Sequence, residues 1–446
     1  MKRNIEKQLQ SWRNDRARMP LLVRGARQVG KSFTIEKFGQ EFFDACVTIN
    51  FDLYPHYATA FESSLEPGRI LETLSVIARQ DIVPGKALLF LDEIQQCPRA
   101  IMALRYFHEM LPELHVIGAG SLLEFALAAE EFRMPVGRIQ YLFMYPMTFG
   151  EFLDAVGEER ARHSIVAHDT TGPFPEAVHA HLLALVKTYC AVGGMPAVVQ
   201  EYRTGKSVQR CQRLQAAIAQ TYRDDFGKYA KKAHLPHLQN LFQSSPKLVG
   251  KKFKYTAVDD SVPSRDLKQA LELLEKAGVV YRVKQTSGDG LPFEAGASER
   301  NFKIVFLDVG LMQNLCGLCG DMLAESDILA VHAGAVAEQF AGQELVENAD
   351  PFIRAGLYYW AREARTSSAE VDYLVACGSR VLPLEVKAGK SGTLRSMHLF
   401  LSQYQSPTGI KVSQTNLQFE DAIMCVPLYA LETLLSLTAS AVAEKQ

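Results

Sequence analysis

Short apolar runs separated by amphipathic stretches define the first third of the chain. The apolar or β-prone runs cover residues 21–23, 46–52, 87–91 and 115–118, and charged and apolar residues mix at helical spacing in 33–38. A short apolar run bounded by polar residues predicts a buried strand. Strands that alternate with helices at crossover length are typical of a parallel sheet. The pattern therefore predicts an α/β fold for this part of the chain.

The pattern changes after residue 155. Glycine, proline and charged residues break all periodicity in 155–175, which predicts a linker. Residues 176–235 favour helices, and we expect a helical lid region there. In 236–290, apolar residues of one helical face lie between Ser264, a predicted N-cap, and Gly278, a predicted C-cap. A strand signal follows, so this region is expected to form a winged-helix-like module.

Length and composition indicate the number of domains, a local basic surface and the compartment of the protein. The chain has 446 residues, enough for about three domains. Its formal net charge is −2, but residues 201–260 hold twelve Lys and Arg against five Asp and Glu, which predicts a local basic surface. The eight cysteines form no disulfide framework, and Cys316 and Cys319 have no second pair at zinc spacing. With no long apolar stretch or signal peptide, the chain is predicted to be soluble and cytoplasmic, without a membrane partner.

The stretch between the first apolar run and the first helical stretch fits the pattern G-x-x-x-x-G-K-[ST]. In such a phosphate loop the glycines let backbone N–H groups turn toward the phosphates, the lysine supplies a charge and the serine hydroxyl holds Mg²⁺. The alternative is an ordinary glycine loop that matches by chance. The pattern predicts ATP binding by Gly25, Arg27, Gln28, Val29, Gly30, Lys31 and Ser32.

Two further apolar runs end in polar residues that suit the same site. The run 87–91 ends at Asp92 and Glu93. One carboxylate suits a Mg²⁺ ligand and the next suits a base that orients the attacking water, so Asp92 is predicted to share the metal with Ser32, and Glu93 to be the base. The run 115–118 ends near Ser121, whose hydroxyl is predicted either to sense the γ-phosphate or to cap a helix.

These motifs together resemble the ATPase core of a large family of bacterial and archaeal AAA+-type proteins. The resemblance implies an ATP hydrolase with a P-loop NTPase core over residues 1–155. It also implies an arginine finger on the γ-phosphate, for which Arg138 is the candidate and Arg133 the rival. A surface arginine paired with an acidic residue is the alternative. The matching segments are Gly25 to Ser32, Leu91 to Gln95, Gly118 to Ser121, Gly137-Arg138, Pro146 to Leu153 and Gly193 to Pro196.

A basic stretch with two aromatic residues follows the helical region. Lys251, Lys252 and Lys254 are predicted to contact the phosphates of DNA, with Phe253 and Tyr255 packing on its backbone. The alternative is a solvated face on a domain that binds a partner protein.

A second group of charged residues is predicted near the C-terminus. Two apolar runs flank a Gly-Ser turn at 378–379, which is a hairpin signal. A turn centred there places Asp372 opposite Glu385 and Glu370 opposite Lys387, with the Cβ atoms of each pair about 4.5–5.5 Å apart. Two facing carboxylates cost stability unless a positive charge lies between them. A divalent metal ion would supply that charge.

The spacing of these residues resembles the PD-(D/E)XK nuclease core. The resemblance implies a small α/β nuclease-like domain over residues 331–446. It also implies that Asp372, Glu385 and the helical Glu338 hold Mg²⁺ or Mn²⁺, and that Lys387 helps to activate a water. A charged surface hairpin, or a core that has lost its activity, is the alternative.

Two classes of function follow from these interpretations. In the first, the protein is an ATPase whose nucleotide cycle controls a DNA-binding, nuclease-like tail, and ATP and DNA are its partners. In the second, it is an NTP-dependent regulatory switch whose tail binds a partner protein or nucleic acid without chemistry. Either class is compatible with a homo-oligomer. Cutting of DNA by the purified protein with Mg²⁺ would separate the two classes.

Overall fold

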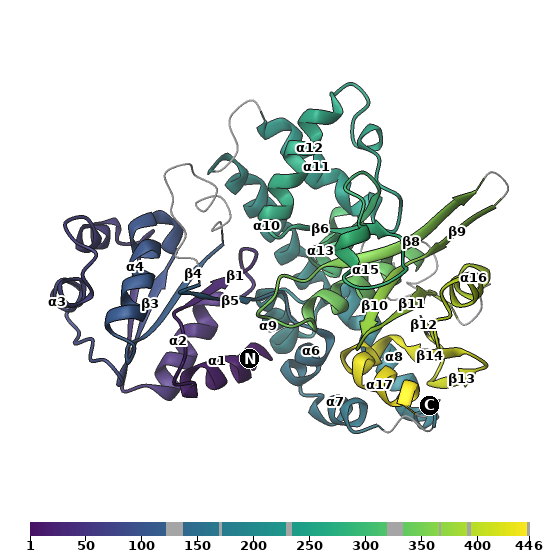
Figure 1. Ribbon diagram of the computed structural model, residues 1–446, viewed down its shortest axis with the longest axis horizontal. Coiled ribbons are helices and arrows are strands. Elements are labelled where there is room, and N and C mark those ends of the chain that lie inside the picture. The colour runs from purple at the N-terminus through teal and green to yellow at the C-terminus, as the bar shows by residue number, and fades with distance from the viewer. Residues whose placement is uncertain are drawn as a thin grey trace.

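The computed structural model describes residues 1–121, 137–168, 172–228, 234–318, 333–364, 367–389 and 394–443. Figure 1 shows the N-terminal sheet and its helices, in purple and blue, at one end of the molecule. The rest of the chain, in teal to yellow, lies at the other end. The N-terminus and helix α1 (Ile5–Asn14) lie near the middle, between the two.

The first sheet is the parallel sheet that the sequence predicts. Its order is β2-β3-β4-β1-β5, and all neighbouring strands are parallel. Because the carboxyl ends of parallel strands meet at one edge, the ends of β1, β3 and β4 lie close together. The P-loop NTPase fold class predicted for the core is confirmed. The strands are β1 (Leu21–Arg24), β2 (Ala45–Asn50), β3 (Ala87–Asp92), β4 (His115–Gly120) and β5 (Gln140–Phe143).

Alternate residues of the central strands pack on opposite faces of this sheet. Leu88 and Phe90 of β3 belong to one core with α1 and α2, whereas Leu89 and Leu91 belong to a second core with α3 and α4. Every residue of β3 and β4 is buried, which is why these strands are continuous apolar runs in the sequence. The covering helices are α2 (Lys31–Phe42), α3 (Pro67–Ala78) and α4 (Pro98–Met110).

Helices dominate the middle of the chain. The prediction of an irregular linker over 155–175 is wrong in part, because α7 lies within it. Pro196 is the first residue of α9, a position that proline favours because its missing N–H needs no helical partner there. Ser264 is the first residue of α12 rather than its N-cap, and Gly278 follows the helix with a left-handed φ of 71°. The helices are α6 (Phe149–Val156), α7 (Glu159–Val166), α8 (Glu176–Val192), α9 (Pro196–Gly205), α10 (Val208–Asp225), α11 (Leu235–Leu248), α12 (Ser264–Lys276) and α13 (Val309–Leu315).

A second sheet joins two regions that the sequence analysis treats separately. Its order is β7-β6-β8-β9, with β6 antiparallel to β7 and parallel to β8. The strand expected as the wing of the winged-helix-like module therefore pairs with a strand of the region expected to be nuclease-like. The strands are β6 (Val280–Thr286), β7 (Phe302–Phe306), β8 (Leu357–Ala364) and β9 (Ser367–Val371).

A third sheet lies in the C-terminal region, in the order β10-β11-β12-β14-β13. Its strands are β10 (Tyr373–Cys377), β11 (Arg380–Val386), β12 (Gly409–Ser413), β13 (Gln418–Glu420) and β14 (Ile423–Pro427). The helices of this region are α15 (Ala333–Glu347), α16 (Arg395–Tyr404) and α17 (Leu434–Ala443). Short 3-10 helices cover Pro55–Phe61, Ile94–Gln96, Phe226–Lys228, Tyr255–Ala257, Phe293–Gly296 and Leu428–Thr433.

Two expectations from composition concern the whole chain. Each cysteine that the structure describes is a free thiol, and Cys319 lies outside the described residues. Within the described ranges, every helix is too short or too polar to cross a bilayer.

Candidate nucleotide site and carboxylate cluster

The phosphate loop joins the end of β1 to the start of α2. Gly25 and Gly30 have φ angles of 152° and 93°, and Gln28 between them has a φ of 62°. A Cβ atom on Gly25 would lie 2.0 Å from the carbonyl oxygen of Met144, so only glycine fits there. Helix α2 begins at Lys31, directly after Gly30. The N–H groups of its first turn are free of helical partners, and such a helix N-terminus attracts phosphate.

Lys31 places a positive charge inside the bend of this loop. Its side chain is buried, and Nζ donates hydrogen bonds to the carbonyl oxygens of Gly25 at 3.0 Å and Ala26 at 2.8 Å. Burial lowers the pKa of Lys31 to about 8, while Glu93 and Asp92 act in the opposite direction. The ammonium therefore lies where a bound phosphate would need a counter-charge.

Asp92 and Ser32 contact each other across the carboxyl edge of the sheet. Ser32 Oγ donates to Asp92 Oδ1 at 2.9 Å, and Asn50 Nδ2 donates to Asp92 Oδ2 at 2.9 Å. Burial raises the pKa of Asp92, and the hydrogen bond from Ser32 opposes that rise. A hydroxyl beside a carboxylate is a donor pair that suits Mg²⁺. The two residues predicted to share the metal are thus brought together.

Glu93 and Ser121 complete the same edge. Glu93 follows β3 with a left-handed φ of 49° and accepts a hydrogen bond from Gln95. Ser121 follows β4, and its buried Oγ has no hydrogen-bond partner within the described parts of the chain. An orphaned hydroxyl at this edge is suited to a ligand. The pocket has a volume of about 300 Å³ and is lined by Arg27, Gln28, Gly30, Lys31, Ser32, Phe33, Asp52, Glu93 and Ser121.

Three residues that the motif does not contain hold the loop from outside. Arg3 Nη1 donates to the carbonyl oxygen of Val29 at 2.8 Å, and the Tyr222 hydroxyl donates to that of Arg27 at 2.6 Å. The Arg27 guanidinium pairs with Asp225, as expected for an acidic residue on a helix near a basic one. The Val29 side chain is fully buried, so it can offer a ligand only its backbone. No sequence signal marks Arg3, because its partners are distant carbonyl groups.

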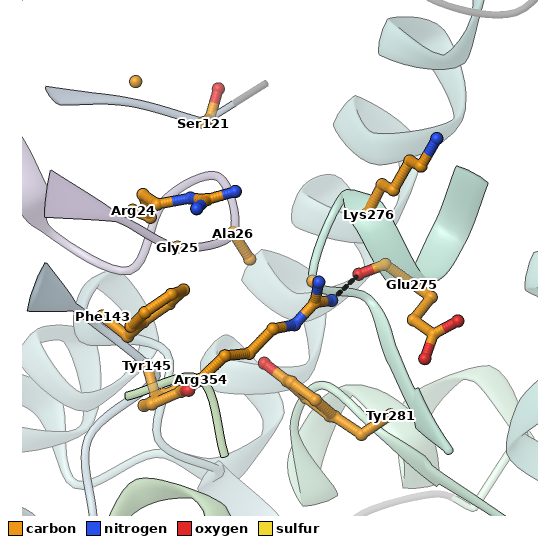
Figure 2. Close-up of a pocket in the computed structure, with 12 residues that line it drawn as sticks. Arg24, Gly25, Ala26, Ser121, Phe143, Tyr145, Glu275, Lys276, Tyr281 and Arg354 are labelled. Atoms are coloured by element: carbon orange, nitrogen blue, oxygen red, sulfur yellow. Dashed lines mark hydrogen bonds between the residues drawn. The ribbon is translucent and has the colours of Figure 1, made fainter. Parts of the chain in front are cut away.

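A second pocket lies beside the phosphate loop at Gly25 and Ala26 (Figure 2). Figure 2 shows Arg24, Lys276 and Arg354 around it, each from a different part of the chain. Arg354 Nη2 donates to the carbonyl oxygen of Glu275 at 2.9 Å. A Cβ atom on Gly278 would lie 3.4 Å from the backbone nitrogen of Ala26, so the end of α12 touches the loop. The C-terminal half of the chain therefore borders the nucleotide site directly.

The candidate arginine finger lies elsewhere. Arg138 is half-exposed, and its Nε lies 3.0 Å from Glu109 Oε1. It precedes β5, whose first residue Gln140 pairs with Leu21, the first residue of β1. The phosphate loop follows the other end of β1, so Arg138 lies at the opposite edge of the sheet and cannot reach the nucleotide of its own chain. Arg133, the rival candidate, lies outside the described residues.

The C-terminal hairpin has the predicted register. Tyr373 pairs with Leu384, and the pairing continues to the Gly-Ser turn. The next residues toward the open end are Asp372 and Glu385, and Asp372 Oδ2 accepts a hydrogen bond from the backbone of Val386 at 2.9 Å. The predicted pairing of Glu370 with Lys387 is wrong, because Glu370 belongs to β9, which pairs with β8.

Lys303 lies among the carboxylates of this cluster. Its Nζ is 2.9 Å from Glu338, 2.6 Å from Glu370 and 3.2 Å from Asp372, and its side chain is only 2% exposed. Burial opposes the charge, but Glu338, Asp372 and Glu370 together raise the pKa of Lys303 above its usual value. Lys387 is less buried and pairs with Glu385 at 2.6 Å. The positive charge expected between the carboxylates is thus an ammonium of the chain.

A metal ion at Glu338, Asp372 and Glu385 stays a prediction, and it would have to take the space that the Lys303 ammonium fills. The donor types suit Mg²⁺ or Mn²⁺. In the described ranges, however, no group of three or more His, Cys, Asp or Glu side chains is placed to hold a metal ion. The physical reason is Lys303, which occupies oxygen atoms that a metal would need. Burial, with Asp372 nearby, raises the pKa of Glu338 and of Glu385 to about 7.

The basic stretch after α11 borders the carboxylate cluster. A Cβ atom on Gly250 would lie 2.9 Å from Glu338 Oε2. Lys251, Lys252 and Lys254 are exposed. The expectation that both aromatic residues pack on DNA is wrong for Phe253, which is buried and stacks on Phe302 with ring centroids 5.1 Å apart.

Three family models match separate parts of the chain. Residues 17–153 match an AAA domain, residues 183–321 match a domain of unknown function (DUF8612), and residues 333–431 match another (DUF4143). Together with the parallel-sheet core, the first match supports an AAA+-type family of ATP-binding P-loop ATPases. No curated protein matches the chain.

Solved structures with a similar arrangement include a Walker-type ATPase of Pyrococcus abyssi, at 16% identity and a TM-score of 0.44, covering 70% of this chain and 94% of that one. Another is the ORC1 protein of Aeropyrum pernix in complex with DNA, at 14% identity and a TM-score of 0.31, covering 71% and 93%. A third is the RuvB Holliday junction branch migration motor of Thermotoga maritima, at 14% identity and a TM-score of 0.29, covering 63% and 89%.

Proposed function

We propose that the protein is a Mg²⁺-dependent ATPase. The contact between Ser32 and Asp92, beside the Lys31 ammonium, is the observation that carries this proposal. Ser32 and Asp92 would hold the Mg²⁺ of the nucleotide, and that ion would neutralise charge on the β- and γ-phosphates. Glu93 is the base that orients the attacking water, and Ser121 contacts the γ-phosphate with its hydroxyl, which no described residue binds.

Two substitutions test the ATPase. Lys31→Ala should abolish nucleotide binding, because the charge inside the loop is lost. Glu93→Gln should keep nucleotide binding and stall hydrolysis, since an amide accepts no proton from water. The exposed residues Lys86 and Glu41 give matched controls, Lys86→Ala and Glu41→Gln. Turnover by Glu93→Gln at the wild-type rate would refute the role of Glu93.

We also propose that the nucleotide cycle acts on the C-terminal half of the chain. The pocket beside the phosphate loop supports this, because Lys276, Gly278 and Arg354 line it together with Gly25 and Ala26. If nucleotide binding moves the phosphate loop, the loop would press on these residues. Arg354 of the C-terminal region and the phosphate loop therefore line the same pocket.

For the tail, we propose binding of nucleic acid by Lys251, Lys252 and Lys254. The position of this basic stretch beside Glu338 supports the proposal, because phosphates bound by the lysines would lie next to the carboxylate cluster. If the tail cuts DNA with Mg²⁺, then Asp372→Asn should abolish cutting while ATP hydrolysis survives. If the wild-type protein binds but does not cut branched, nicked or linear DNA, the regulatory switch is the better description.

A further inference from the structure

Lys303 differs from the other lysines near the carboxylate cluster. It comes from β7, before the region predicted to be nuclease-like, and its ammonium lies among carboxylates from α15, from β9 and from the residue before β10. An ammonium has three N–H donors, and Lys303 has three carboxylate partners, Glu338, Glu370 and Asp372. By contrast, Lys387 is 26% exposed and pairs with Glu385.

The geometry around Lys303 excludes a metal ion at the same place. The distances from Nζ to the three carboxylates are 2.6–3.2 Å. These are the distances of an ammonium that donates to carboxylates, so Nζ fills the space between the oxygen atoms that a metal ion would take. The cluster still has spare acceptor capacity, because the buried Oε2 of Glu385 has no hydrogen-bond partner among the described residues.

The carboxylates of the cluster also outnumber the lysines that pair with them. Glu338, Glu370, Asp372 and Glu385 bring up to four negative charges; Lys303 and Lys387 pair with them, and the buried Lys411 is the neighbour of Glu385 on β12. Removing Lys303 would leave two half-buried carboxylates, Glu338 and Asp372, and the more exposed Glu370 without this partner, which costs stability unless another cation takes its place. A divalent ion is the replacement that oxygen ligands of this kind prefer.

We propose that the Lys303 ammonium is a built-in competitor of divalent metal ions at this cluster. While it is in place, it holds Glu338, Glu370 and Asp372 together and keeps the cluster closed to metal. Displacement of Lys303 opens the cluster. This inference rests on the same carboxylates as the proposed function of the tail. It does not require that the tail cuts nucleic acid.

The test is Mn²⁺ titration of the full-length protein by calorimetry, without nucleotide. All variants carry Asp92→Asn, so that the nucleotide site loses its carboxylate metal ligand. Lys303→Met should bind Mn²⁺ about tenfold tighter than the parent or better, a change of about 1.4 kcal/mol. Lys387→Met is the matched control, because it also removes one positive charge from the cluster. It should change the Mn²⁺ affinity much less. Adding Asp372→Asn to Lys303→Met should abolish the gain.

Each outcome has a distinct meaning. Tight binding by Lys303→Met alone supports the inference. Equally tight binding by the parent and Lys303→Met overturns it, yet leaves the carboxylates as a metal site for the proposed tail function. Weak binding by both overturns the inference and removes the metal site as well. An equal gain in Lys387→Met would reduce the effect to net charge and also overturn it.

A second measurement detects metal binding even if a variant is less stable than the parent. The melting temperature with and without Mn²⁺ reports binding even in a destabilised variant, because a ligand of the native state stabilises it. Lys303→Gln provides a second substitution, since its amide can still donate to the carboxylates but carries no charge. Both variants should gain more stability from Mn²⁺ than the parent. If neither does, the inference is wrong.

Discussion

Replacing Arg3 with methionine should destabilise the ATPase core and weaken ATP binding. Arg3 is 9% exposed and donates to the carbonyl oxygens of Val29 and Tyr145, each at 2.8 Å, and Pro146 at 3.1 Å. It also pairs with the buried Glu151, with Nε and Oε2 3.1 Å apart. The methionine side chain has similar length but no donor. The variant therefore leaves a buried carboxylate without its cation and three carbonyl groups without their donor.

The expected loss follows from these contacts. Removing one partner of a buried ion pair costs about 3–5 kcal/mol of unfolding free energy. Glu151 keeps hydrogen bonds from the backbone N–H groups of Thr148 and Asn4, so the lower end, about 3 kcal/mol, is expected. Urea unfolding followed by circular dichroism measures the loss. Calorimetry measures the affinity for ATP, which should fall because the Val29 carbonyl in the loop is no longer held.

A matched control separates the contacts of Arg3 from its charge. Arg16→Met removes an exposed arginine from the same end of the chain and should change stability by no more than about 0.5 kcal/mol. An Arg3→Met variant that loses less than about 1 kcal/mol, or no more than Arg16→Met does, would refute the reasoning. So would unaltered ATP binding in a variant that is clearly destabilised.

Two further predictions concern the basic stretch and a buried histidine. Replacing Lys251, Lys252 and Lys254 with alanine should weaken DNA binding and lower its salt dependence by roughly one unit of slope per phosphate contact removed; unchanged affinity and slope would assign the stretch to a protein-binding surface. Burial lowers the pKa of His115 to about 4 from 6.5, so the unfolded chain takes up its proton first and stability is lost as pH falls from about 6.5 toward 4. His115→Gln should therefore lose less stability between pH 7 and pH 5 than the wild type in urea unfolding, and an equal loss in both would contradict the prediction.

Local patterns in the sequence predicted much of the core. The strand before Gly25, the strand that ends at Asp92 and the turn at 378–379 each depend on neighbouring residues alone. Burial on both faces makes a strand a continuous apolar run, and a Gly-Ser turn sets the register of a hairpin. The contact between Ser32 and Asp92 also followed, because parallel strands bring their carboxyl ends to one edge.

The same patterns did not predict contacts between residues that are far apart in the sequence. Arg138 matches a motif. Its distance from the phosphate loop, however, depends on the edge of the sheet at which β5 begins. Phe253 stands among lysines in the sequence but packs on Phe302, about fifty residues later. Lys303 lies in an apolar strand with no acidic neighbour, and its carboxylate partners come from α15, β9 and the start of β10. Such contacts are set by the tertiary fold and leave no spacing to recognise.

A short stretch of chain connects the phosphate loop to the carboxylate cluster. Gly278 touches Ala26 of the loop, and β6 begins two residues later. Within β6, Val283 pairs with Lys303 on β7. Strand β6 is held on both sides, because it pairs with β7 and with β8. Movement of the phosphate loop with its nucleotide therefore has a structural route to Lys303, the residue that keeps metal out of the cluster. If the route operates, hydrolysis at one site and access of cations to the other belong to a single cycle.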